Sequence, residues 1–332
     1  MSKTYSGDKI VIKGKETGSL YPTNREETFK EILVEGVEEQ FELQGGIFAN
    51  NITLKGYGLI KGPVFARKDA EISPEGGVIT MQSGITALNS LAIKETGKSG
   101  LKRRLSYSID NLKTIIRGDI LTEKKLILND TIVIGSINAP DIKLTNCIVF
   151  GVIKNSRQLT IENCTIGIYV TNRLNLIGRN GFFIAGGKSI ERPVYVINNE
   201  QEKPKIRFIP LCRLSGYGCA MGKELDGEET EEQVGLCCSL WVTGNCPYEE
   251  EVSLQQVDFA QLEIGGRKDW YLGIQGRTMT LSKIDEINKN FNRILHGIFA
   301  FDHLTNEDKE AERDKWEQVS STEKKIYDIA TR

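Results

Sequence analysis

Residues 118–187 read GDILTEKKLILNDTIV (118–133), IGSINAPDIKLTNCIVF (134–150), GVIKNSRQLTIENCTI (151–166) and GIYVTNRLNLIGRNGFFIAGG (167–187). Glycine returns at intervals of 17, 16 and 16 residues, at Gly118, Gly135, Gly151 and Gly167. Short apolar triplets lie between the glycines, at 126–128, 142–144, 159–161 and 174–176. A repeat of this length has no room for a helix in each unit, so the stretch predicts the stacked turns of a β-solenoid.

The same period is present nearer the N-terminus. Residues 46–49 (GIFA) are echoed by residues 62–66 (GPVFA), and the two glycines are 16 positions apart. Residues 94–107 (KETGKSGLKRRLSY) interrupt the pattern and predict a loop inserted at one corner. We therefore expect a mainly β fold in which residues 41–190 form a parallel β-helix with turns of 16–17 residues.

Residues 1–40 are expected to cap the solenoid, because a terminal turn must cover an open apolar end. Lys9 to Lys13 alternates between apolar and polar residues as a strand does. The segment from Glu26 to Glu39 is compatible with a short helix or with an atypical capping turn. The sequence leaves these two alternatives open.

Residues 205–332 lose the period and are predicted to form a smaller α+β domain. The segment 251–264, followed by Gly265-Gly266 and by residues 270–281, predicts an antiparallel hairpin. A capping-box-like start at Ser282 precedes the strongest helical pattern in the chain. That pattern places six apolar residues on one face, namely Ile284, Ile287, Phe291, Ile294, Leu295 and Ile298. Two further helices are expected at 305–319 and 320–329.

Four short polar residues, Asp130, Asn146, Asn163 and Asn180, fall at matching positions of the repeat. Residues of this type tolerate the turned backbone of a corner, and their side chains can bond to copies in adjacent coils. We expect a structural ladder, and the alternative is a row of metal-binding or catalytic groups. Cys147 and Cys164 also occupy equivalent positions and are expected to stack inside the solenoid as small hydrophobic residues.

The turns of 16–18 residues, rich in Gly-Ile and Gly-Val and built of three short strands, resemble those of the bactofilins, a family of bacterial polymer-forming proteins. The resemblance covers residues 41–93 and 109–187. It implies a compact right-handed β-helix whose copies associate end to end into filaments without a nucleotide. This chain departs from the family because residues 205–332 follow the solenoid. It also lacks the apolar membrane-targeting N-terminus that bactofilins carry.

The bulk composition argues against several classes of function. A net charge of −2 over 332 residues does not suit a protein that binds nucleic acid or an anionic membrane surface. No window has the length and apolarity of a signal peptide or a transmembrane span. Together with seven cysteines, an odd number, this favours a reducing cytoplasm over a disulfide framework.

Five cysteines in the C-terminal region are weak candidates for a metal site: Cys212, Cys219, Cys237, Cys238 and Cys246. Thiolates bind zinc and iron–sulfur clusters, but none of these spacings is the short knuckle typical of structural zinc. The favoured interpretation is a set of buried free thiols and no cofactor, and a zinc or iron–sulfur site is the alternative.

Two charged segments are candidate partner-binding sites. One is basic and contains Lys98, Lys102, Arg103 and Arg104; the other is acidic and contains Glu228, Glu229, Glu231 and Glu232. Each is compatible with a solvated loop, and the acidic segment of one copy is also suited to dock on the basic segment of another. The region 205–332 as a whole is a candidate surface for another protein.

The sequence contains no catalytic signature. Carbohydrate-cleaving β-helices use carboxylates gathered on one face, whereas Asp119, Asp130 and Asp141 lie on successive turns at different phases. We therefore expect a cytoplasmic, non-enzymatic scaffold that self-associates as a homo-oligomer or filament. The alternative is a carbohydrate-directed β-helix protein, either a polysaccharide lyase or hydrolase or a phage or surface fibre.

Overall fold

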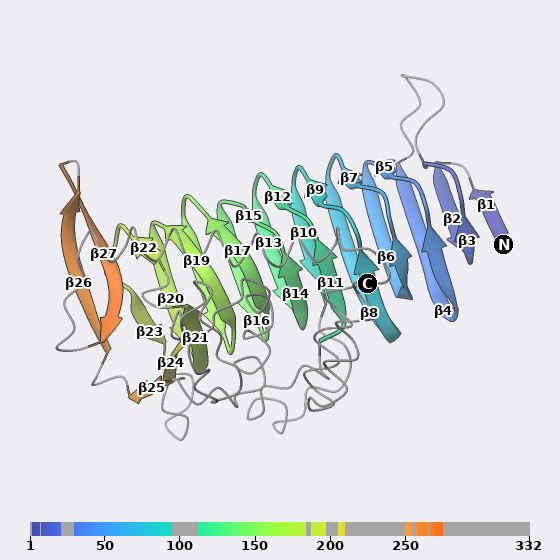
Figure 1. Ribbon diagram of the computed structural model, residues 1–332. Coiled ribbons are helices and arrows are strands. Elements are labelled where there is room, and N and C mark those ends of the chain that lie inside the picture. The colour runs from blue at the N-terminus through green and yellow to red at the C-terminus, as the bar shows by residue number, and fades with distance from the viewer. Residues whose placement is uncertain are drawn as a thin grey trace, which may run out of the picture.

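The computed structural model describes residues 2–6, 8–20, 30–94, 112–183, 187–196, 205–209, 250–253, 257–264 and 266–274. These residues form a β-solenoid of about nine turns, in which short strands stack in parallel along one axis (Figure 1). The described residues contain no helix. The chain winds through three columns of paired strands, here named faces A, B and C in the order in which each coil visits them.

Face A opens each coil. Its strands are β2 (Lys9–Lys13), β4 (Glu31–Leu43), β6 (Asn51–Ile60), β8 (Asp69–Met81), β10 (Ser90–Ile93), β13 (Lys125–Asn129), β16 (Asp141–Thr145), β18 (Gln158–Glu162), β20 (Arg173–Ile177) and β23 (Val194–Val196). Consecutive members pair in parallel and in register, so that Leu126, Ile142 and Leu159 superpose along the axis. The predicted column of aliphatic residues is confirmed.

Face B follows within each coil. It contains β3 (Lys15–Glu16), the later parts of β4, β6 and β8, β11 (Thr114–Arg117), β14 (Thr131–Ile134), the first parts of β17 (Ile148–Lys154) and β19 (Thr165–Thr171), β21 (Arg179–Phe183) and β24 (Lys205–Ile209). Face C closes each coil with β5 (Ile47–Ala49), β7 (Val64–Ala66), β9 (Ile85–Ala87), β12 (Ile120–Thr122), β15 (Ile137–Asn138), the later parts of β17 and β19, and β22 (Gly187–Ser189). Between the two ends of the solenoid, these strands pair in parallel with the coil before and the coil after.

Along the strands of the coils whose side chains are described, about one side chain in two points inward, and the inward set forms a single core. The burial pattern of β6 alternates over its whole length, with Ile52, Leu54 and Ile60 fully enclosed. Neighbouring coils lie about 4.8 Å apart, so each inward side chain contacts its counterparts above and below. Burying a Leu or Ile contributes about 1.5–3 kcal/mol, which makes the shared column the main source of stability.

Parallel pairing extends beyond the range 41–190 at both ends. Strand β2 pairs with β4, and β24 pairs with β21. The expectation of a helix or capping turn within 26–39 is wrong where the structure describes it, because Glu31 begins the strand β4. Ile32 and Val34 alternate inward, and pairing with strands on both sides outweighs the weak helical spacing.

The predicted hairpin is present but shorter. Strands β26 (Val257–Ile264) and β27 (Arg267–Ile274) pair antiparallel across a turn in which Gly266 has a φ of 78°. Strand β25 (Glu250–Ser253) pairs with β24 instead of joining the hairpin. The predicted helices at 282–298, 305–319 and 320–329 lie outside the described residues, as does the inserted loop after Lys94, so the α+β character of the C-terminal region remains a prediction.

Candidate functional site

The N-terminal end of the solenoid is finished by an antiparallel strand. Strand β1 (Ser2–Ser6) lies against β2, with Ser2 opposite Lys13. Face B ends at β3, where Glu16 occupies the inward column in register with Leu43. Its Oε1 accepts a hydrogen bond from the backbone N–H of Gly18 at 3.3 Å. An inward-pointing charged residue is one of the devices that keep an edge from receiving a further apolar strand.

The C-terminal end is finished in the same manner. Strand β25 lies antiparallel on β24, and β27 lies antiparallel on β22. The buried Asp269 of β27 forms ion pairs with Lys188 Nζ and with Arg267 Nε, both at 2.9 Å. The guanidinium carbon of Arg192 stands 5.5 Å from the ring centre of Trp270, a cation–π distance. These contacts fasten the hairpin to the last coil.

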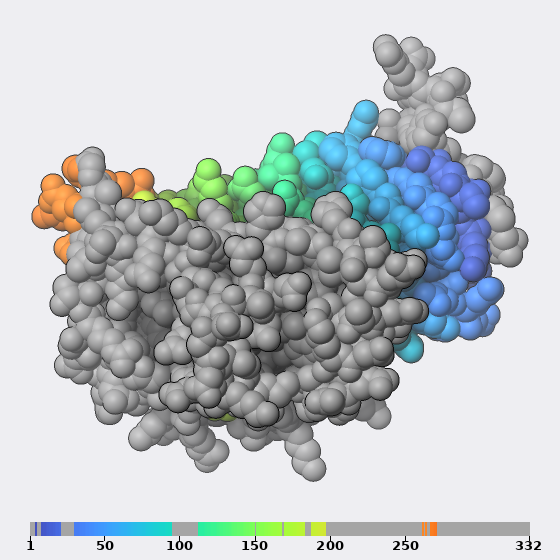
Figure 2. Space-filling view, viewed as in Figure 1, coloured from blue at the N-terminus to red at the C-terminus, as the bar shows by residue number. Residues whose placement is uncertain are grey.

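The outermost strands each present one edge. Among the described strands, β1 pairs with β2 alone and β26 pairs with β27 alone. These two strands lie at opposite ends of the rod (Figure 1). In the space-filling view, the coloured atoms of the first coils (blue) and of the C-terminal hairpin (orange) likewise lie at opposite ends of the molecule (Figure 2). A strand edge carries N–H and C=O groups able to pair with another chain.

A polar column runs inside the solenoid at the start of face B. Thr114, Thr131, Cys147, Cys164 and Asn180 occupy successive levels of it and are fully buried. The N–H of Cys147 lies 3.4 Å from the Sγ of Cys164, and the N–H of Cys164 donates to the Oδ1 of Asn180 at 3.0 Å. Both thiols are free, as the sequence predicted. Burial, reinforced by the neighbouring Cys164, raises the pKa of the Cys147 thiol well above its ordinary value.

The predicted ladder of short polar residues is correct at three positions and wrong at the fourth. Asp130, Asn146 and Asn163 stack at the corner between faces A and B, with φ of 49°, 53° and 53°. The next level of that corner is Gly178, with a φ of 68°, because Glu162 pairs with Ile177. Asn180 therefore belongs to the interior column beside Cys164.

The ladder is held by side-chain bonds between coils. Asn146 Nδ2 donates to Asp130 Oδ1 at 2.5 Å, and the backbone N–H of Arg179 donates to Asn163 Oδ1 at 2.8 Å. These bonds satisfy polar groups where the backbone turns, so the three residues have a structural role at this corner.

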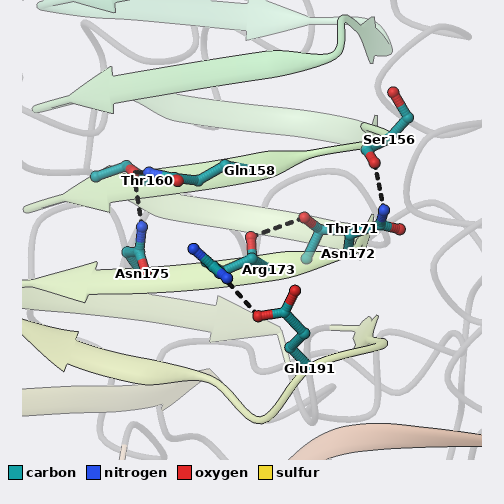
Figure 3. A network of polar contacts seen from close by, with 8 residues as sticks. All are labelled: Ser156, Gln158, Thr160, Thr171, Asn172, Arg173, Asn175 and Glu191. Atoms are coloured by element: carbon teal, nitrogen blue, oxygen red, sulfur yellow. Dashed lines mark hydrogen bonds and ion pairs between the residues drawn. The ribbon is translucent and has the colours of Figure 1, made fainter.

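A second polar network lies on the outside of face A and at the corner that leads into it (Figure 3). Asn175 Nδ2 donates to Thr160 Oγ1 at 3.3 Å, and Gln158 Nε2 donates to the same oxygen at 3.0 Å. Arg173 forms an ion pair with Glu191 at 2.8 Å. The Asn175–Thr160 bond and the Arg173–Glu191 pair each join two successive coils on the outer surface.

The three aspartates on successive turns, Asp119, Asp130 and Asp141, lie at different places on the coils. Asp119 Oδ1 accepts from the N–H of Ser136 at 2.8 Å at the corner between faces B and C. Asp130 is at the corner between faces A and B. Asp141 begins a face A strand and forms an ion pair with Arg157 at 2.9 Å. The structure does not bring these carboxylates together.

Comparison with protein-family models, curated proteins and solved structures finds no match. The resemblance to bactofilins therefore stays a prediction.

The remaining candidate residues lie outside the described ranges. They are Cys212, Cys219, Cys237, Cys238, Cys246, Lys98, Lys102, Arg103, Arg104, Glu228, Glu229, Glu231 and Glu232. Within the part of the chain that is described, no three His, Cys, Asp or Glu side chains are grouped as a metal site requires. No helix among the same residues is long and apolar enough to cross a membrane.

Proposed function

We propose that this chain is a non-enzymatic scaffold whose copies associate through the strand edges at the two ends of the solenoid. The observation that carries the proposal is the arrangement of β1 and β26, each paired along one edge to a single described strand. Strand β26 is eight residues long, which gives a partner strand a full ladder of backbone hydrogen bonds.

The geometry of the pairing decides what kind of assembly forms. Two β26 edges joined about a twofold axis give a closed dimer. An edge of β26 joined to an edge of β1 is a head-to-tail contact, and repetition of that contact gives an open filament. The position of the two strands at opposite ends of a rod supports the second arrangement (Figure 1).

The test uses the full chain and two neighbouring proline substitutions, Ala260→Pro and Gln261→Pro. Adjacent residues of a strand direct their N–H groups to opposite edges, so one variant removes a bond to β27 and the other removes a donor from the edge opposite β27. Hydrogen exchange over 267–274 identifies the variant whose hairpin remains intact. Light scattering and negative-stain microscopy then measure assembly, and we expect the intact-hairpin variant to dissociate at least tenfold more readily than the parent chain.

Three outcomes contradict the proposal. The first is a parent chain that is monomeric at micromolar concentration. The second is assembly that persists in both variants. The third is assembly that is lost only in the variant whose hairpin is lost. The last outcome would show that the hairpin is needed for the assembly but that its edge is not the contact.

A second candidate function is a carbohydrate-directed β-helix protein, and the polar network on face A favours it. Amide and hydroxyl groups such as those of Gln158, Thr160 and Asn175 are suitable donors and acceptors for sugar hydroxyls. The same light-scattering samples, titrated with polysaccharide fragments, separate the two functions. A discrete monomer that binds or cleaves an oligosaccharide replaces the scaffold proposal.

A further inference from the structure

The two ends of the solenoid carry different numbers of strands on each face. At the N-terminal end, the first coil consists of β2 on face A, β3 on face B and Leu20 on face C, each paired with the coil that follows. Among the described strands, only β1 lies beyond this coil, and it lies antiparallel on β2. This end therefore has one extra strand, on face A alone.

The C-terminal end has the opposite arrangement (Figure 1). Strands β23, β24 and β27 lie at one level, because they pair with β20, β21 and β22 of the coil before. Faces B and C continue for one level more, since β25 lies on β24 and β26 lies on β27. On face A, no described strand lies beyond β23. The ladder of face A therefore stops one strand short of the other two.

The exposure of the β23 side chains shows that this edge is accessible to solvent. Tyr195 is the inward residue of β23, because it pairs with the buried Leu176 of the coil before. Leu176 is only 1% exposed, whereas Tyr195 is half-buried and the neighbouring Val194 is 48% exposed. The core is thus partly open at the point where face A stops.

We propose that β1 of a second copy pairs with β23 and supplies the missing level of face A. The face A strands all run in one direction and β1 runs opposite to β2, so the pairing of β1 with β23 is antiparallel. Strands β25 and β26 of the first copy then meet β3 and Leu20 of the second. All three ladders continue from one rod into the next at the coil spacing of about 4.8 Å.

This inference rests on the head-to-tail association proposed above and specifies its strand contacts. The edges of β1 and β26 take part in the same joint, but each meets a coil of the other copy and the two do not pair together. A contact between two different surfaces repeats without closing when the rods are coaxial, so the product is a filament with one direction.

The charges at the two ends favour this joint. The N-terminal strands β1, β2 and β3 contain Lys3, Lys9, Lys13 and Lys15, and their one acidic residue is Glu16. The carboxylates that pair with Lys9, Lys13 and Lys15 lie one coil further from the end. Strands β25 and β26 contain Glu250, Glu251, Asp258 and Glu263 and no basic residue. Opposite charges attract unlike ends and repel like ends, which favours head-to-tail over head-to-head contact.

The register of face B brings one pair of opposite charges together. Lys15 begins a column of paired residues that runs through Glu42 and ends at Glu251. If this column continues across the joint, Glu251 of one copy lies beside Lys15 of the next. The Lys15 side chain is 74% exposed and forms an ion pair with Glu42 at 3.0 Å. The same continuation places Glu250 beside Glu16, a like-charged pair, so Lys15 supplies the favourable charge contact on this face.

Photo-cross-linking of the full chain tests the contact on face A. Benzoylphenylalanine replaces Thr4, which is exposed and lies in the column of face A that ends at Val194. Isotopically light and heavy chains are mixed before assembly, and we expect links from position 4 to residues 194–196 of the other copy. The matched control places the probe at Lys143, an exposed residue of the same column in the middle of the rod, and should give no such link.

The other outcomes separate this inference from the scaffold proposal. Links from position 4 to residues 257–264 of the other copy would keep head-to-tail association but overturn the pairing of β1 with β23. Links between residues 2–6 of two copies would overturn the head-to-tail arrangement itself. Assembled protein with no link between copies from position 4 would overturn the inference alone. A parent chain that stays monomeric would overturn both proposals.

A charge exchange tests the contact on face B without the probe. Lys15→Glu is expected to weaken association about tenfold in low salt, and addition of Glu251→Lys to the same chain should restore it. The matched control is Lys61→Glu, because Lys61 Nζ pairs with the same Glu42, at 3.6 Å, but lies away from the end. Sedimentation equilibrium measures the dissociation constants. Equal losses in the Lys15 and Lys61 variants, or no recovery in the double variant, would overturn the assigned register.

Discussion

The early and the late coils of the solenoid turn the same corner in different ways. In the early coils, the strands β4, β6 and β8 run from face A into face B without ending, and the pairing register shifts between Gly36 and Phe41 and between Gly56 and Gly58. In the late coils, the strand ends and a single residue in the left-handed conformation makes the turn, as Asn146 does with a φ of 53°.

The two corners depend on opposite properties of their residues. A Cβ added at Gly56 would lie 2.2 Å from the backbone carbon of Gly36, so the early corner requires the absence of a side chain. The late corner requires a particular side chain, because the Oδ1 of Asn163 accepts a bond from the next coil. One solenoid thus uses close backbone approach in one half and side-chain bonding in the other.

The largest expected effect is at the early corner. Gly56→Ala forces a Cβ into the backbone of the neighbouring coil at a φ of 103°, and we expect it to lower the free energy of unfolding by at least about 3 kcal/mol. The matched control is Gly76→Ala, which has a φ of 75° but whose nearest neighbour is 3.5 Å away. Because only backbone strain acts there, a loss of about 1–2 kcal/mol is expected. Urea denaturation measures both, and equal losses would show that close approach does not matter.

A smaller effect is expected at the late corner. Asn163→Ala loses the acceptor for the Arg179 N–H and holds alanine in the left-handed region, at a combined cost of about 2 kcal/mol. Asn163→Gly removes the same acceptor without the backbone strain, and about 1 kcal/mol is expected. If the two variants are equally stable in urea, the left-handed backbone contributes nothing to this corner.

The interior of the two halves should differ in its response to alkaline pH. The column that holds Phe41 and Ile79 in the early coils holds Cys147 in the late coils. Since the pKa of the Cys147 thiol is raised by folding, the unfolded chain loses this proton first, and stability falls as pH rises above the unfolded value. Between about pH 8.5 and 9.5 the loss should be about 1 kcal/mol for this thiol.

The measurement is urea denaturation across that pH range, with Cys147→Ala as the comparison. The variant is less stable at neutral pH, but its pH slope should be smaller than that of the parent chain. A slope that Cys147→Ala leaves unchanged would assign the alkaline sensitivity to other groups.

The smallest effects belong to the exposed ion pairs between coils. Lys13→Ala in the early half and Arg157→Ala in the late half each remove a pair of about 3 Å to Glu35 or Asp141. Both groups are substantially solvated, so each loss should be at most about 0.5 kcal/mol and should decrease as salt is added. If either variant lowers the free energy of unfolding by more than about 1 kcal/mol in low salt, these exposed ion pairs contribute more to stability than solvated surface pairs ordinarily do.

The late half was the more predictable from sequence, because its regular spacing marks the core directly. Leu126, Ile142 and Leu159 are in register as expected. The strands of the early half are harder to predict from sequence. In β4, Gly36 and Val37 interrupt the alternation of apolar and polar residues, which weakens the signal for a strand. The spacing of 16–17 residues between corners predicts Asn180 at the corner after Asn163. The coil between them is shorter, because Glu162 pairs with Ile177, and the corner residue is therefore Gly178.

The late strands of face B differ in sequence from those of face A. Residues 131–134 read TIVI and residues 147–150 read CIVF, without polar alternation. A strand that is apolar on both sides is typical of a sheet buried on both faces. Ile132 and Ile148, which lie outside the core cluster, are buried as that pattern predicts. The two edge strands could not be foreseen in this way, because their role depends on where the stack ends.

The winding of the coils also has a mechanical consequence. Each turn stores roughly 16 residues within about 4.8 Å of axial length, and the same residues fully extended span about 50 Å. Because neighbouring turns are joined edge to edge, tension on one terminus would peel them away singly. The molecule would then lengthen in steps of tens of ångströms, one turn unfolding at a time, while the remaining turns stayed folded.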